Sequence, residues 1–131
     1  MIDCLVIGDS IAVGVQQFRQ ECAIYAKVGI NSRDWNNKFI GKDLRANTVI
    51  ISLGSNDSGN IKTAAELNEL RQSVTSKKVV WILPSNNSDK RDIVKFIAEK
   101  YGDMVLGVNQ LSKDGVHPTV AGYKELANNT K

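Results

Sequence analysis

Four polar residues of this 131-residue sequence have types and spacings that could support acyl transfer by a serine hydroxyl. Ser10 is a candidate nucleophile, and His117, the only histidine, is a candidate general base. Asp114 lies three residues before His117, with Gly115 between them to allow a tight turn, so its carboxylate could orient the imidazole. Asn56 carries an amide that could donate a hydrogen bond to an oxyanion. Serine-based acyl transfer requires these four parts.

Each of these residues also has an ordinary structural interpretation. Ser10 could be only the N-cap of a helix, and Asp114 and Asn56 could be only turn residues. His117 could be a surface histidine that precedes a proline in a loop. The chemical interpretation therefore depends on the elements that position the four residues.

Apolar runs rich in valine and isoleucine alternate along the chain with amphipathic stretches. Several of the runs are continuous, which is typical of strands buried on both faces of a parallel sheet. Five strands are expected, at residues 4–7, 23–28, 48–53, 78–83 and 104–108. Five helices are expected, at residues 11–21, 32–39, 61–75, 89–101 and 119–128. The last residues, 128–131, are expected to fray.

This alternation predicts one α/β domain over residues 1–131, a flavodoxin-like three-layer sandwich with a five-stranded parallel sheet and helices on both faces. In such sheets ligands bind beyond the carboxyl ends of the strands. Small and polar residues follow every predicted strand, as in Gly8-Asp9-Ser10 and Gly29-Ile30-Asn31-Ser32. The fold alone does not require them there, so the sequence predicts a site at this edge.

Three of the segments at this edge resemble the motif blocks of the SGNH, or GDSL-type, hydrolases. Gly8-Asp9-Ser10 is similar to the first block, Gly54-Ser55-Asn56-Asp57 to the third, and Asp114-Gly115-Val116-His117-Pro118 to the last. Each segment alone is a weak signal, but the ordered set is specific and spans nearly the whole chain. The resemblance implies that Ser10 is the nucleophile, that His117 is the base and that Asp114 holds the tautomer of His117. It also implies that the Ser10 backbone amide and the Asn56 side chain bind the oxyanion.

The second block departs from the family pattern, in which a glycine amide completes the oxyanion hole. In one register Ser32 stands at the glycine position, and in the other register Gly29 itself donates. Because any residue except proline has a backbone amide, serine is chemically acceptable, and we favour Ser32.

Three further residues, Asp9, Trp35 and Asn86, are predicted to line the substrate site, with Asp9 supporting the turn rather than reacting. Trp35 lies in a polar segment and could shape a sugar-binding surface, whereas Trp81 lies inside a predicted strand and is expected in the core. The connections between elements are short and leave little material for a lid. We therefore expect an open, shallow site suited to small acyl groups such as acetyl.

Composition and cysteine content limit the classes of partner and cofactor that this protein is expected to bind. A net charge of +3 without a basic cluster predicts no nucleic-acid partner. Cys4 and Cys22 lie in apolar surroundings and are expected to be reduced thiols in the core. The sequence has no metal-ligand spacing, so no metal or other cofactor is expected. It also shows no signal-peptide pattern and no apolar run of about 20 residues, which predicts a cytoplasmic protein without membrane contact.

These observations lead to the expectation of a serine ester hydrolase for small acyl esters, in particular O-acetyl esters of a carbohydrate or a small metabolite. The alternative is a binding or structural module of the same fold without turnover, which the departure at Ser32 favours. A nucleotide or phosphate binder is disfavoured, because the chain has no Walker or Gly-x-Gly-x-x-Gly loop. The oligomeric state is left open.

Overall fold

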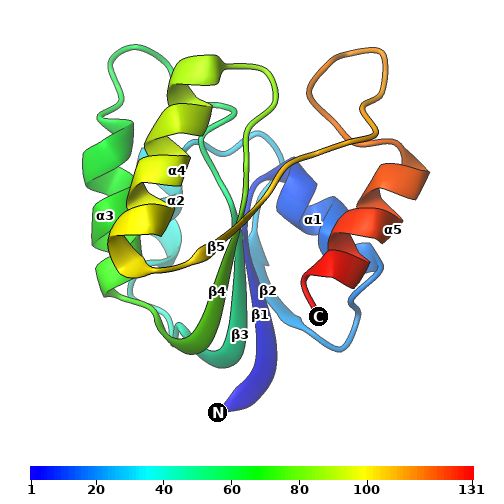
Figure 1. The fold of residues 1–131 in the computed structure, drawn as a ribbon. Coiled ribbons are helices and arrows are strands. Elements are labelled where there is room, and N and C mark those ends of the chain that lie inside the picture. Colours follow the sequence, from blue (N-terminus) through cyan, green and yellow to red (C-terminus); the bar gives the residue numbers. More distant parts are fainter.

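A five-stranded parallel sheet forms the middle layer of the structure, a computed structural model that describes residues 1–131 (Figure 1). The strands lie in the order β2-β1-β3-β4-β5, which is the flavodoxin-like order predicted from the sequence. Their bounds are β1 (Ile2–Gly8), β2 (Ala23–Ala26), β3 (Arg45–Ser52), β4 (Thr75–Ile82) and β5 (Met104–Leu106).

Helices cover both faces of the sheet, as Figure 1 shows. One face carries α1 and α5, and the other carries α2, α3 and α4. Their bounds are α1 (Ser10–Gln17), α2 (Ser32–Phe39), α3 (Thr63–Gln72), α4 (Ser88–Tyr101) and α5 (Val120–Asn129). The helix predicted over residues 61–75 ends earlier, because Thr75 pairs with Arg45 and begins β4. None of the helices combines the length and the apolarity that crossing a bilayer requires.

Burial on both faces explains why the strands read as continuous apolar runs. Neighbouring side chains on a strand point to opposite faces. On β1, Cys4 and Val6 belong to the apolar cluster under α1 and α5, whereas Leu5 and Ile7 belong to the cluster under the other three helices. Trp81 is fully buried in the second of these clusters, so its prediction as a core residue is confirmed.

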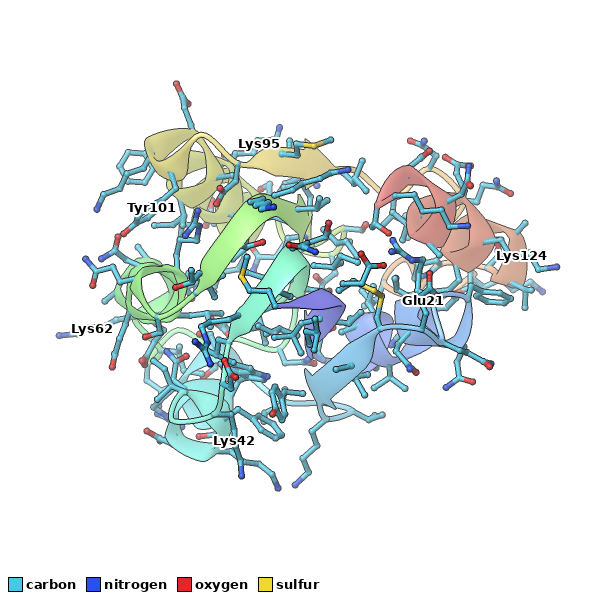
Figure 2. All side chains as sticks on the ribbon, turned by 90° about the horizontal axis from the view of Figure 1, so that it is seen from below. Glu21, Lys42, Lys62, Lys95, Tyr101 and Lys124 are labelled. Carbon is cyan, nitrogen blue, oxygen red and sulfur yellow. A yellow bond between two sulfur atoms is a disulfide. The ribbon has the colours of Figure 1, made fainter.

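Cys4 and Cys22 form a disulfide bond, and the prediction of two reduced thiols is wrong. Cys4 lies on β1, and Cys22 directly precedes the neighbouring strand β2. This pairing brings the two Cα atoms to 4.7 Å, within the range of a disulfide. Figure 2 shows the sulfur–sulfur bond beside Glu21. The potential ligand atoms of Glu21 and the two cysteines lie within 4.8 Å of one another, but the bonded sulfurs offer no thiolate to a metal ion.

The C-terminal end of the chain is anchored rather than frayed. Thr130 is fully buried, and its hydroxyl accepts a hydrogen bond from Arg19 Nη1 at 2.6 Å. Arg19 is itself buried and also pairs with Glu21. Contacts with the segment after α1 therefore hold residues that the sequence alone predicted to be mobile.

Candidate active site

The turn after β1 places Ser10 at the first position of α1. Asp9, not Ser10, caps this helix, because its Oδ1 accepts a hydrogen bond from the backbone amide of Ile11 at 3.0 Å. The Ser10 hydroxyl is therefore free for another partner. Its Oγ lies 2.8 Å from Nε2 of His117, although 107 positions separate the two residues in the sequence.

Gly8 lets this turn approach β3 closely. Its φ of +142° is one that residues with a side chain rarely adopt, and a Cβ atom there would lie 1.9 Å from the carbonyl oxygen of Ser52. The backbone amide of Asp9 donates to the same oxygen at 3.0 Å. This contact fixes the position of Ser10 relative to the sheet.

The carboxyl group of Asp9 is buried beneath the turn. Its Oδ1 accepts a second hydrogen bond from Ser52 Oγ at 3.1 Å, whereas its Oδ2 has no hydrogen-bond partner. Burial raises the pKa of Asp9 to about 6, because a charged carboxylate loses its hydration there. The prediction that Asp9 lines the substrate site is wrong, because only 1% of the residue is exposed. Asp9 supports the turn instead.

The loop between β5 and α5 carries His117 and Asp114. Oδ2 of Asp114 lies 2.7 Å from Nδ1 of His117. Oδ1 accepts hydrogen bonds from the backbone amides of Val116 and His117. The hydrogen bond with the His117 side chain has the largest effect on the pKa of Asp114, and the two backbone amides add to it. Together they hold this pKa well below its usual range. An ionised carboxylate at Nδ1 favours a proton on that nitrogen, which leaves Nε2 free to accept the Ser10 proton.

Two hydrogen-bond donors that follow the neighbouring strands β1 and β3 are candidates for binding an oxyanion. The backbone amide of Ser10 has no acceptor within the protein. Asn56, on the loop after β3, donates one Nδ2 hydrogen to the carbonyl oxygen of Ile30 at 3.1 Å. Because a side-chain amide has two such hydrogens, the second is left for a ligand. The bond to Ile30 also fixes the orientation of the Asn56 side chain.

Ser32 does not offer a free backbone amide, so its prediction as an oxyanion donor is wrong. The Ser32 amide donates to Oδ1 of Asp57 at 2.8 Å, and the Ser32 hydroxyl donates to Oδ2 at 2.6 Å. Thr63 Oγ1 donates to the same Oδ2 at 2.7 Å, so this carboxylate joins the first residues of α2 and α3. Gly29, the alternative donor, is exposed on the turn after β2 and remains a prediction.

The other two residues predicted to line the site, Trp35 and Asn86, have different surroundings in the structure. Trp35 is fully buried, and its Nε1 donates to the carbonyl oxygen of Tyr25 at 2.9 Å. It is a core residue of α2, so its prediction is wrong. Asn86 is exposed after β4, and its Nδ2 donates to the carbonyl oxygen of Ser55 at 3.1 Å. This places Asn86 beside the loop that carries Asn56, and a contact with substrate remains a prediction.

Three supporting residues have roles that the sequence analysis did not assign. Ser52 holds the carboxyl group of Asp9, and Asp57 holds Ser32. Ser112 donates through Oγ to Asp114 and, through its backbone amide, to the carbonyl oxygen of His117. Asp57 stands within a motif segment and could have been noticed there. Ser52 carries no local signal, because its partner Asp9 lies 43 positions away in the sequence. Ser112 lies two residues before Asp114 in the same loop, next to the motif segment rather than within it.

Solved structures share this fold, although no protein-family model and no curated protein sequence matches the chain. The C-terminal catalytic domain of peptidoglycan O-acetyltransferase A from Streptococcus pneumoniae has a TM-score of 0.64 at 18% identity, over 96% of this chain and 88% of that one. A protein described as a GDSL-like lipase, from Bacteroides uniformis, has a TM-score of 0.70 at 15% identity, over 96% and 92%. An acetyl xylan esterase from the rumen bacterium Butyrivibrio proteoclasticus has a TM-score of 0.57 at 12% identity, over 97% and 62%. The chain therefore has the fold that the resemblance to SGNH hydrolases predicted.

Proposed function

We propose that this chain is a serine ester hydrolase that removes short acyl groups through an acyl-enzyme intermediate. The observation that carries the proposal is the continuous hydrogen-bond chain from Asp114 through His117 to Ser10, with distances of 2.7 and 2.8 Å. A hydroxyl, an imidazole and a carboxylate in this order form the arrangement that activates a serine for attack on an acyl group.

In the first half of the reaction His117 accepts the Ser10 proton at Nε2 while Oγ attacks the carbonyl carbon of the ester. The oxyanion that forms accepts hydrogen bonds from the Ser10 amide and from Asn56. Asp114 stabilises the imidazolium at Nδ1. His117 then returns the proton to the departing alcohol, and the acyl group stays on Ser10.

In the second half water replaces the alcohol. His117 accepts a proton from that water as it attacks the acyl carbon, and Ser10 leaves with the proton restored. The products are a carboxylic acid and the free enzyme. The same two oxyanion donors serve both halves, because a tetrahedral intermediate forms in each.

The preference for a short acyl group is proposed from the exposure of the site. The side chains of His117 and Asp114 are 42% and 50% exposed, so this part of the site is open to solvent. An open site of this kind offers little apolar surface to a long acyl chain. Two of the neighbours in fold are named for acetyl chemistry on glycans, which supports O-acetyl esters of a carbohydrate as the substrate class.

The first test compares hydrolysis of p-nitrophenyl acetate by the wild type and by Ser10→Ala, with the fold of each checked by circular dichroism. We expect turnover by the wild type and a fall to background in the variant. Ser73→Ala is the matched control, because this exposed serine lies at the end of α3 and its hydroxyl donates only to the Glu69 carbonyl oxygen. Equal rates for wild type and Ser10→Ala would contradict the proposal.

The alternative function, a binding module without turnover, has one observation in its favour. The amide of Ser32, which stands where the family has an oxyanion donor, is bonded to Asp57. A fluorophosphonate probe separates the two functions, because only an activated serine reacts with it. Labelling of Ser10, located by peptide mass spectrometry, supports the hydrolase. A protein that neither turns over the acetate ester nor takes the label would be the module.

A further inference from the structure

Arg91 is the one arginine of the five in this chain that has no ion-pair partner. Arg19, Arg33, Arg45 and Arg71 each lie within 3.4 Å of a carboxylate oxygen. Arg91 is half-buried on the first turn of α4 and makes no side-chain hydrogen bond within the protein. A cation in the first turn of a helix also opposes the helix dipole, so the fold gains nothing from its charge.

Arg91 lines a depression of about 200 Å³ between the loop after β4 and the segment that follows β5. The other walls are apolar or neutral: Leu83, Pro84, Ser85, Gly107, Val108 and Leu111. No other charged group lines it. A single unpaired guanidinium among neutral walls is suited to one negatively charged group, and its planar fork matches the two oxygens of a carboxylate.

The depression lies at the same edge of the sheet as the candidate active site. Leu111 on its wall pairs with Pro118, the residue after His117, and the Ser112 amide bonds to the His117 carbonyl oxygen. In the sheet order β1-β3-β4-β5, Ser10 follows β1, two to three strands away. Because neighbouring strands are about 4.8 Å apart, roughly 10–15 Å separates the depression from Ser10. This span is comparable to two or three sugar units.

We propose that Arg91 and this depression form a subsite for a carboxylate of the substrate, so that the preferred ester is an acylated acidic glycan, with uronic-acid units near the ester. This inference rests on the proposed function, and it adds the charge of the substrate and the residue that recognises it. Arg91 binds the carboxylate through two N–H donors, and Ser85 supplies a neutral polar contact.

The test uses O-acetylated polygalacturonate and its methyl-esterified form, which share a backbone but differ in the charge of each unit. Acetate release is measured for the wild type, for Arg91→Gln, and for Lys95→Gln as the matched control. Lys95, labelled in Figure 2, lies one turn further along α4 and is exposed. Both substitutions therefore remove one positive charge from the same helix.

We expect the wild type to have a lower KM for the anionic polymer than for the methyl ester. Arg91→Gln should raise the KM for the anionic polymer by about 10- to 100-fold and abolish the preference, since a charge-assisted hydrogen bond is lost. Lys95→Gln should keep the preference. Equal KM values for the two polymers in the wild type, or a preference that survives in Arg91→Gln, would overturn the inference.

A binding measurement keeps this inference distinguishable from the proposed function. Trigalacturonate and its methyl ester are titrated into Ser10→Ala, and the backbone amide signals of Gly107 and Val108 are followed by NMR. The subsite is supported if trigalacturonate, but not its methyl ester, causes saturable shifts of these signals and if the shifts disappear in the double variant Ser10→Ala, Arg91→Gln. This holds even if the wild type hydrolyses no ester. Absence of such shifts contradicts the subsite, even if the wild type hydrolyses p-nitrophenyl acetate.

Discussion

At the scale of single residues, two aspartates of the candidate active site lie in opposite electrostatic settings. Asp114 is exposed, and its hydrogen bonds with His117 hold its pKa well below the usual range. Asp9 is buried beneath Ser10, where loss of hydration raises its pKa to about 6. The first carboxylate is therefore suited to orienting a base, and the second to supporting a turn.

Asp114→Asn tests the orienting role. The amide cannot hold the imidazole with the proton on Nδ1 as a carboxylate does, so we expect kcat/KM for p-nitrophenyl acetate to fall by roughly 100- to 10,000-fold. The fold should be retained, because the side chain is half exposed. Circular dichroism and thermal unfolding provide the control. A variant with near-normal kcat/KM would remove Asp114 from the proposed mechanism.

Asp9→Asn tests the buried carboxyl group. The pKa of Asp9 is about 6 in the folded protein and 3.8 in the reference state, so folding favours the protonated form. Its contribution to stability is complete below about pH 4 and is lost as the pH rises through about 6. Relative to Asp9→Asn, the wild type should lose up to about 3 kcal/mol of unfolding free energy across that window.

Urea denaturation at several pH values between about 4 and 7.5 provides the measurement for Asp9. Asp3→Asn is the control, because Asp3 is exposed on β1, and its profile should run parallel to that of the wild type. If the profile of Asp9→Asn also runs parallel to the wild type, Asp9 does not titrate in this range.

At the scale of elements, one buried ion pair connects α3, β4 and the turn before β5. Arg71 donates to both carboxylate oxygens of Asp103, at 2.7 and 3.0 Å, and Trp81 Nε1 donates to one of them at 2.9 Å. The Asp103 side chain is only 5% exposed. This pair ties the helical layer to the end of the sheet opposite the candidate site.

Asp103→Ala should lower the unfolding free energy by about 3 to 5 kcal/mol, because it leaves a nearly buried guanidinium without its partner. The matched control is Asp43→Ala, which breaks the exposed ion pair with Arg45 and should change stability little. Chemical denaturation of both variants is the measurement. Equal losses for the two variants would show that burial does not set the contribution of the Asp103 pair.

At the scale of the whole molecule, the Cys4–Cys22 disulfide encloses the segment that carries Ser10. The two residues are separated by 18 positions, and the second half of β1, the turn with Ser10 and α1 lie between them. Such a cross-link limits the freedom of the unfolded chain. Because structural disulfides persist in oxidising compartments, this bond weighs against the cytoplasmic location expected from the sequence, which stays a prediction.

Removing the disulfide tests its contribution to stability. Cys4→Ala combined with Cys22→Ala should lower the unfolding free energy by about 3 kcal/mol, the amount typical of a loop of this length. Urea denaturation with and without dithiothreitol checks that the disulfide bond itself causes the difference in stability. The reductant should destabilise the wild type but leave the double variant unchanged. A wild type insensitive to reductant would contradict a stabilising disulfide.

The sequence by itself determined the order of strands and helices and the edge of the sheet where small polar residues gather. Hydrophobic periodicity is local, so continuous apolar runs such as residues 48–53 predict buried strands without knowledge of their neighbours. The motif segments around Ser10 and His117 could also be identified from the sequence, because each motif is a short run of consecutive residues.

The tertiary structure alone decided which partners those residues have. It brings Ser10 to His117 across 107 positions, occupies the Ser32 amide with Asp57, and joins Cys4 to Cys22. It also buries Trp35, which a polar sequence neighbourhood had suggested would be exposed. Hydrogen-bond partners and burial depend on residues that are distant in the chain, so no local pattern could assign them.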